Sequence, residues 1–228
     1  MRGFRVEGII LKRRNFGEAD RILTVFTLQR GKISVLAKGV RRITSRRAGS
    51  VELLNRSILY LHVGKGMPIL TEAQSLDTYS KLKNDLTLST YSFHIIELVD
   101  KLTAENQENR ILYEHLVEVF KRLERNPRQI LIRAFEAKIL ANLGFISFKN
   151  PPQSNVAGTF DVPQVSIQIH PKGVHIKLLE ELEILSWDEI EKMKINQKEA
   201  IELERVLRYH VERVLESSLK SRTFLRKL

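Results

Sequence analysis

Cysteine is absent from the 228 residues of this sequence. Its absence excludes disulfide bonds, zinc sites with thiolate ligands, iron–sulfur clusters and a thiol nucleophile. No stretch approaches about 18 uncharged apolar residues, and the N-terminus lacks the apolar core and small cleavage-site residues of a secretory signal. We therefore expect a soluble protein of the cytoplasm with no membrane segment.

Sequence motifs of catalysis are lacking as well. The chain has no serine nucleophile elbow, no HExxH motif and no paired carboxylates suited to acid–base chemistry. The segment Gly64–Gly66 follows a strand-like stretch but lacks the upstream glycine of a phosphate-binding P-loop, so a hairpin turn is the simpler interpretation. Asp20 and Arg21 are expected to form an ion pair that fixes a turn. We expect a protein that is not an enzyme and needs no cofactor.

Acidic residues are scarce in the first 50 positions, which hold 3 of them against 13 lysines and arginines. The other 178 residues are almost balanced, with 24 acidic and 25 basic side chains. The densest part of the excess, Lys38–Arg47, contains five cations and no acid. A basic surface confined to one end of a chain is typical of proteins that bind a phosphate backbone. The alternative is a solvated loop or a feature that serves colloidal solubility.

The first 76 residues have the pattern of short β-strands. The expected strands cover residues 4–13, 21–26, 32–36, 57–63 and 69–74. Gly8, inside the first strand, is typical of a bend at a barrel corner, and Gln29–Gly31 supplies hairpin turn chemistry. Five strands in this order predict a small closed barrel, most often an OB-fold in nucleic-acid proteins, although length alone does not separate it from an SH3-like barrel.

From about Tyr79 the hydrophobic period becomes helical. Helices are expected over residues 79–103, 109–125 and 126–144. In the third helix, Asn126 is the expected N-cap with Pro127 in the first turn and Gln129 completing a capping pair, and Gly144 is placed to end the helix in the left-handed conformation.

Residues 145–177 interrupt the helical pattern with prolines and a glycine. Val165, Ile167 and Ile169 then alternate, as do Val174 and Ile176, which predicts a small β-hairpin. Helix is expected again near 178–192 and from Asn196, paired with Glu199, to about residue 220. The fold class is therefore α+β: an OB-fold barrel in residues 1–78, then a helical domain in residues 79–228 with a hairpin insertion.

Particular blocks of sequence point to a family. They are Glu7–Leu11, Gly17–Thr27 with the motif GEADRI, Gly31–Arg42 with KGxRR, Ser45-Arg46, Arg133–Gly144 and Leu219–Leu225. Together they resemble the RecO family of bacterial recombination mediators in DNA repair. The resemblance implies an OB barrel with a helical domain, binding of single- and double-stranded DNA, and annealing of complementary strands. It also implies binding of the acidic C-terminal tail of single-strand DNA-binding protein, cooperation with RecR to load RecA, and association with the nucleoid.

The sequence departs from many members of that family at two places. Residues 145–177 occupy the position of a four-cysteine zinc module, and His170 and His175 lack a third ligand, so no metal is expected. Arg47 stands where some relatives have an aromatic residue, which removes a stacking role at that position.

Nonspecific binding of single strands requires cations along the phosphates and aromatic faces for the bases. The candidate phosphate contacts are Arg13, Arg14, Lys38, Arg41, Arg42, Arg46 and Arg47. Phe16 is the expected stacking ring, with a plug at the barrel end as the alternative, whereas Phe4, Phe26 and Tyr60 are expected in the core. About five neutralised phosphates predict a slope of roughly −3.5 for the logarithm of affinity against log salt. The loop of residues 42–47 is expected to be mobile because its like charges repel.

The third helix offers a candidate site for the acidic tail of single-strand DNA-binding protein. Ile132, Phe135 and Ile139 would form an apolar floor, and Arg128, Arg133 or Lys138 would form a cationic rim. The alternative is that this stripe is ordinary core. His210, on the stripe of the last helix, is expected at the core or its boundary. The cations Lys220, Arg222, Arg226 and Lys227 form a second basic cluster, or simply complement the helix dipole.

Two rival functions fit parts of this pattern. An RNA-binding OB-fold protein of translation or ribosome assembly would carry the same electrostatics, and a preference for RNA over DNA would reveal it. A phosphate-handling enzyme is the other, although the missing motifs argue against it.

Overall fold

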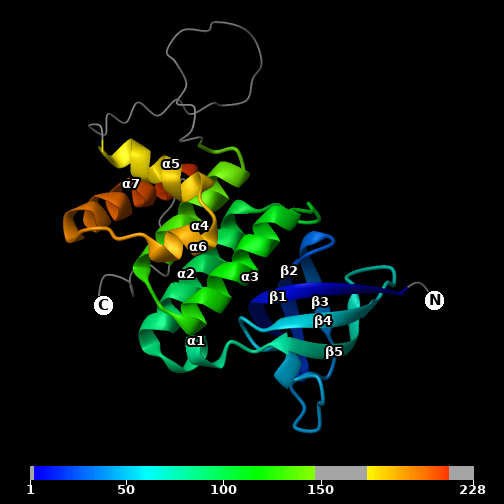
Figure 1. Cartoon of the computed structure of the whole chain (residues 1–228). Coiled ribbons are helices and arrows are strands. Elements are labelled where there is room, and N and C mark those ends of the chain that lie inside the picture. Colours follow the sequence, from blue (N-terminus) through cyan, green and yellow to red (C-terminus); the bar gives the residue numbers. More distant parts are fainter. Residues whose placement is uncertain (1–2, 147–173, 216–228) are drawn as a thin grey trace, which may run out of the picture. The chain divides into compact units, whose positions relative to one another are not determined.

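A computed structural model of the chain describes residues 3–146 and 174–215. The described chain forms two compact units, residues 3–126 and residues 127–215. The first unit contains five strands and the helices that follow them, and the second is entirely helical (Figure 1). The boundary predicted near residue 78 lies between the last strand and the first helix, whereas the division into compact units falls after Asn126.

The strands of the first unit close into a barrel. They are β1 (Gly3–Phe16), β2 (Asp20–Thr27), β3 (Gly31–Ala37), β4 (Arg56–His62) and β5 (Ile69–Asp77). Their order around the barrel is β1-β2-β3-β5-β4, and antiparallel pairing of β1 with β4 completes the circle. Between β3 and β5 the pairing is parallel, at Leu36 and Ile69. This arrangement confirms the predicted five-stranded OB-type barrel and the α+β class.

The barrel interior is filled by alternating apolar side chains from all five strands. Those exposed by 1% or less include Val6, Ile10, Leu23, Val25, Val35, Leu59 and Leu70. A β-bulge between Ile10 and Lys12 bends β1, which lets this long strand pair with both β2 and β4. At Gly8 a Cβ atom would lie only 2.5 Å from Cγ1 of Val25, so close approach of β2 explains this glycine.

Three helices complete the first unit: α1 (Ser80–Asn84), α2 (Leu86–Leu102) and α3 (Arg110–Arg125). The single helix predicted over residues 79–103 is wrong, because Asp85 is extended and begins a new helix. Its carboxylate accepts a hydrogen bond from the Leu88 N–H at 2.8 Å, which is an N-cap. Asn109 caps α3 in the same way, accepting from Leu112 N–H at 2.9 Å.

Helix α4 (Gln129–Asn142) opens the second unit. The prediction that Asn126 caps this helix is wrong, because Asn126 ends α3 and donates its N–H to the Arg122 carbonyl oxygen at 2.7 Å. Arg128 precedes α4 without a side-chain cap, and Pro127 lies before the helix rather than in its first turn. At the other end Gly144 has φ +74°, which confirms the predicted left-handed terminus.

The remaining helices are α5 (Val174–Ile184), α6 (Trp187–Lys192) and α7 (Gln197–Leu215). Val174 and Ile176 belong to α5, so the second strand of the predicted hairpin is wrong. The first strand and most of the segment at the zinc-module position lie outside the described residues, as do the four C-terminal cations. The pair Asn196 and Glu199 exchanges hydrogen bonds of 2.8 and 2.9 Å, which confirms the predicted start of the last helix.

The core of the second unit lies around α4, which packs against α5, α6 and α7. In the part of the chain that the structure describes, no helix combines the length and the hydropathy needed to cross a bilayer.

Candidate nucleic-acid interface

The loop after β3 leaves the barrel beside the turn between β1 and β2. Gly39 has φ +65°, and its N–H donates to Oδ1 of Asp20 at 2.7 Å. Arg41 N–H donates to the Ala19 carbonyl oxygen at 2.9 Å, so the two loops are joined along their backbones. The expected ion pair of Asp20 with Arg21 is wrong in its partners, because Asp20 accepts from Gly39 and Arg21 lies 3.7 Å from the carboxylate of Glu52.

Arg47 ties the far end of this loop to the barrel. Its Nη2 donates to the Lys38 carbonyl oxygen at 2.9 Å, and its Nη1 donates to the Leu70 carbonyl oxygen at 2.6 Å. A longer contact of 3.4 Å joins Nη1 to the carbonyl oxygen of Thr71. These bonds direct the guanidinium toward the backbone of the protein, so Arg47 organises the loop instead of presenting its charge outward.

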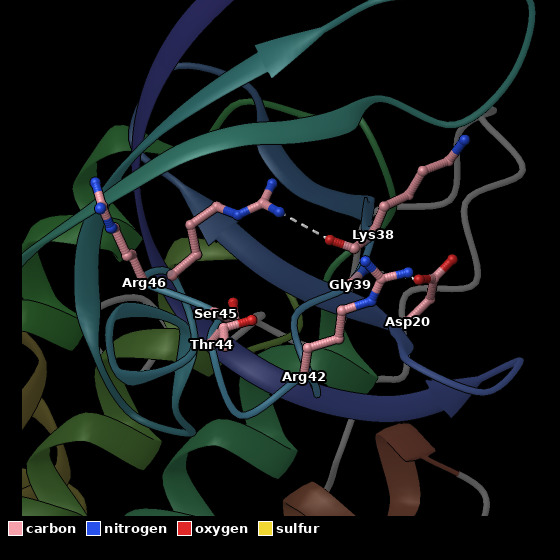
Figure 2. A pocket seen from close by; sticks show the side chains of 8 residues that line it. Asp20, Lys38, Gly39, Arg42, Thr44, Ser45 and Arg46 are labelled. Atoms are coloured by element: carbon pink, nitrogen blue, oxygen red, sulfur yellow. Dashed lines mark hydrogen bonds between the residues drawn. The ribbon is translucent and has the colours of Figure 1, made fainter.

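A hollow of about 450 Å³ lies between this loop and the barrel. The residues that line it are Asp20, Lys38, Gly39, Arg42, Thr44, Ser45, Arg46 and Arg47 (Figure 2). We call this the basic hollow. Its four cations outnumber its single carboxylate, and Lys38, Arg42 and Arg46 are accessible to solvent. Guanidinium, ammonium and hydroxyl donors on one concave surface are suited to phosphate oxygens.

Of the four other predicted DNA contacts, three are exposed and one is partly buried. Arg41 is exposed and donates to the Gly17 carbonyl oxygen at 3.3 Å. Arg14 and Phe16 are exposed at the end of β1, and 51% of the Phe16 surface is accessible, so Phe16 is no core plug. Arg13 is partly buried in an ion pair with Glu52, which removes it from the exposed set.

The aromatic residues of the strands differ in their burial. The expectation that Tyr60 lies in the core is wrong, because 39% of its surface is exposed on the outer face of β4. Phe26 is fully buried as predicted. Phe4 packs against the barrel core, and the Arg30 guanidinium lies 4.1 Å from the centre of its ring. The alternation of β4 could have predicted that Tyr60 faces outward, since its neighbours Leu59 and Leu61 fill the interior.

The residues of the candidate tail site on α4 are buried or paired within the second unit. Ile132, Phe135 and Ile139 are exposed by at most 1%, and they are core residues of the second unit. Arg133 pairs with Glu136 at 2.8 Å and with Glu204 at 3.4 Å.

The two other proposed rim cations close the ends of neighbouring helices. Arg128 donates to the carbonyl oxygens of Glu191 and Met193 at the end of α6. Lys138 donates to those of Glu183 and Leu185 at the end of α5, and burial lowers its pKa although Glu183 opposes this. All three cations are therefore occupied within the second unit.

Part of the barrel wall is covered inside the first unit. Lys32 on β3 donates to the Asp100 carbonyl oxygen at the end of α2, and Ser34 donates to Glu105 at 3.1 Å. Burial lowers the pKa of Lys32, and the nearby carboxylates of Asp100 and Glu105 oppose that shift. Asn106 N–H donates to the Lys32 carbonyl oxygen at 2.8 Å. The segment after α2 therefore lies along the first half of β3.

Fold and site together define an OB-barrel protein with a cationic hollow at one barrel end and a helical second unit. Comparison with known proteins gives the family. Residues 1–79 match the model for the N-terminal region of recombination protein O, and residues 83–146 match the model for its C-terminal region. The chain belongs to the RecO family.

Individual relatives match over the whole chain or over most of it. The DNA repair protein RecO of Pelotomaculum thermopropionicum is 29% identical, in an alignment covering 99% of this chain and 94% of the relative. That of Desulforamulus reducens is 28% identical over 100% of this chain and 96% of the relative. That of Acetivibrio thermocellus is 36% identical over 64% of this chain and 59% of the relative.

Proposed function

We propose that this protein is a recombination mediator in DNA repair. It binds single- and double-stranded DNA through the barrel and anneals complementary strands. With RecR it helps load RecA onto DNA coated by single-strand DNA-binding protein, in the cytoplasm and at the nucleoid. Membership of the RecO family supports the repair role, and the basic hollow is the observation that supports DNA binding by the barrel.

The proposed mechanism is electrostatic and involves no bond making. Two DNA strands repel each other through their phosphates, and cations that neutralise phosphates on both strands lower this barrier to pairing. Lys38, Arg42 and Arg46 are accessible side chains able to do so, and they read no base edges when they contact phosphates. No nucleotide, metal or nucleophile takes part in this scheme.

The test is annealing of two complementary oligonucleotides, one of them coated with single-strand DNA-binding protein. The variant replaces Lys38, Arg42 and Arg46 by alanine and keeps Arg47, because Arg47 holds the loop in place. A matched control removes three exposed lysines elsewhere, Lys121, Lys194 and Lys198. We expect annealing by the wild type and the control but not by the variant.

Salt dependence adds a quantitative check. A wild-type slope of roughly −3.5 should become shallower by about 0.7 for each phosphate of a single strand that the variant no longer neutralises. A wild type that neither anneals nor binds DNA would refute the proposal. Stronger binding of RNA than of DNA of the same sequence would favour an RNA-binding function.

Binding of the acidic tail of single-strand DNA-binding protein is proposed for the second unit. The apolar residues Ile132, Phe135 and Ile139 are buried there, so a tail site on α4 requires that the unit opens to expose them. Amide hydrogen exchange of α4 with and without a tail peptide tests this requirement. Tight peptide binding without any change in α4 exchange would move the site to other residues.

A further inference from the structure

A second depression lies where the first residues of β1 meet the end of β4 and the start of β5. Its volume is about 400 Å³, and it is lined by Gly3, Phe4, Arg5, Tyr60, Leu61, His62 and Thr71. We call it the Tyr60 groove. The exposed ring of Tyr60, the guanidinium of Arg5 and the imidazole of His62 thus border one shallow site, whereas the Phe4 ring packs against the barrel core. An aromatic ring beside a cation is the combination that stacks a base and holds its phosphate.

The register of the sheet places the important side chains together. Arg5 on β1 is paired with Tyr60 on β4, so their side chains are direct cross-strand neighbours on the outer face. Both are exposed. Tyr60 exposes 39% of its surface, and the adjacent guanidinium of Arg5 can accompany a stacked base with a contact to its phosphate.

The Tyr60 groove adjoins the basic hollow through the start of β5. Thr71 lines the groove, and its hydroxyl donates to the Tyr60 carbonyl oxygen at 3.0 Å. The carbonyl oxygens of Leu70 and Thr71 also accept hydrogen bonds from Arg47, which lines the basic hollow. The backbone of Leu70 and Thr71 therefore borders both sites.

The usual ligand face of an OB barrel centres on the second and third strands and the loops beside them. Here the first half of β3 is covered by the end of α2 and the segment after it, through the contacts of Lys32 with Asp100 and of Ser34 with Glu105. A Cβ atom at Gly31 would lie 1.8 Å from the Gln107 carbonyl oxygen, so this covering segment touches the strand itself. The first half of β3 is therefore covered, whereas Tyr60 on β4 is exposed.

We propose that the Tyr60 groove is a base-stacking site for single-stranded nucleic acid whose neighbouring phosphates lie in the basic hollow. The proposal rests on the proposed DNA-binding function and adds to it a second, non-electrostatic contribution to affinity. Arg5 borders the groove and supplies the cation for a phosphate of this occupant. On the other side of Tyr60 its cross-strand partner on β5 is the exposed Glu72, so the phosphate belongs on the Arg5 side. Tyr60 is the residue that carries the stacking.

The test compares two probes of equal length and charge, a 15-nucleotide oligothymidylate and an abasic oligonucleotide. Full-length wild type should bind the thymidylate about five- to tenfold more tightly than the abasic probe, which is the contribution of roughly one stacked base. Tyr60→Ala should reduce this preference and keep the salt dependence of binding. Tyr60→Phe should keep the preference because it retains a ring. Phe93→Ala, which removes another exposed ring on α2, should also keep it.

The outcomes separate this proposal from the one on which it rests. A Tyr60→Ala variant that keeps both salt-dependent binding and the full preference for thymidylate would overturn the groove and leave the basic hollow standing. Binding of neither probe by the wild type would overturn both. An acidic peptide with a C-terminal phenylalanine provides the competing arm. Loss of its binding in Tyr60→Ala, with the thymidylate preference intact, would assign the groove to a peptide and overturn its assignment to DNA.

Discussion

Arg47 donates a hydrogen bond from Nη2 to the main-chain carbonyl oxygen of Lys38, nine residues earlier at the start of the same loop. The same guanidinium also bonds to the backbone of β5. One side chain thus closes the loop that carries the exposed cations. The neighbouring Arg46 is exposed, so two consecutive arginines have different tasks.

We expect Arg47→Ala to lower the free energy of unfolding by about 1–3 kcal/mol, because partly buried carbonyl oxygens are deprived of a charged donor. Arg47→Lys should not restore stability, since an ammonium group does not reproduce the planar fork of donors. Arg46→Ala should leave stability unchanged and reduce the salt slope by about 0.7. Urea unfolding and salt titrations provide the measurements. Equal stability of wild type and Arg47→Ala would show that the loop does not depend on this residue.

Arg56 at the start of β4 forms ion pairs with the first and the last strand of the barrel. It lies 2.7 Å from Glu7 and 2.7 Å from Asp77, and Tyr113 donates to Glu7 at 3.0 Å. Arg56→Ala leaves two partly buried carboxylates without this partner, so we expect a decrease of about 2 kcal/mol in unfolding free energy.

The control for Arg56 is Arg110→Ala, which breaks a well-exposed helical pair with Glu114. Such pairs contribute about 0.3–0.5 kcal/mol, so the control should unfold almost like the wild type in urea. A similar decrease in unfolding free energy in the two variants would mean that burial does not strengthen the Arg56 interactions.

Gly31 combines a left-handed backbone with a close neighbour. Its φ is +62°, and an added Cβ would lie 1.8 Å from the Gln107 carbonyl oxygen. We expect Gly31→Ala to destabilise the first unit by about 3 kcal/mol, from backbone strain and from displacement of the covering segment.

Gly17→Ala is the matched control, since Gly17 has φ +56° but nothing within 4 Å of an added Cβ. Gly17→Ala should lower the free energy of unfolding by about 1–2 kcal/mol, from backbone strain alone. Thermal or urea unfolding of the two variants isolates the contribution of the contact with Gln107. Equal costs would show that the segment moves aside freely.

His210 is buried in α7, and burial followed by the charge of Arg213 lowers its pKa to about 4. The unfolded chain therefore binds a proton at His210 at a higher pH than the folded chain does. The stability associated with neutral His210 is complete above about pH 6.5 and is lost as the pH falls toward 4, by up to about 3 kcal/mol.

The variant His210→Leu should lack this part of the pH dependence. The measurement is the difference in unfolding free energy between wild type and variant at pH 7 and pH 4.5. We expect the wild type to weaken more than the variant on acidification. A constant difference across this range would contradict the lowered pKa.

Sequence periodicity predicted the barrel strands and most helices because each burial pattern repeats along one element. It failed at Asp85, where a cap divides an otherwise continuous helical pattern, and at Asn126, where Asn-Pro fits the end of one helix as well as the start of the next. Local sequence contains both options, and packing selects between them.

In the candidate site, too, some properties follow from local sequence and others depend on packing. Ile58 and Tyr60 have the same parity on β4, yet Ile58 is buried and Tyr60 is exposed. Alternation separates the inner face from the outer face, but it contains no information on which outer residues other elements cover. On α4, the consecutive residues Ile130, Leu131 and Ile132 are all buried, since neighbouring helices surround it.

The sequence by itself determined the class of protein: an N-terminal barrel with concentrated positive charge, followed by helices. Alternation, helical period and net charge are local or additive properties, so they can be read without coordinates. Only the tertiary structure decided that Arg46 faces solvent while Arg47 holds the backbone, and that Tyr60 faces outward beside Arg5. Those outcomes depend on which distant segments meet, because carbonyl acceptors and covering side chains come from residues far away in the chain.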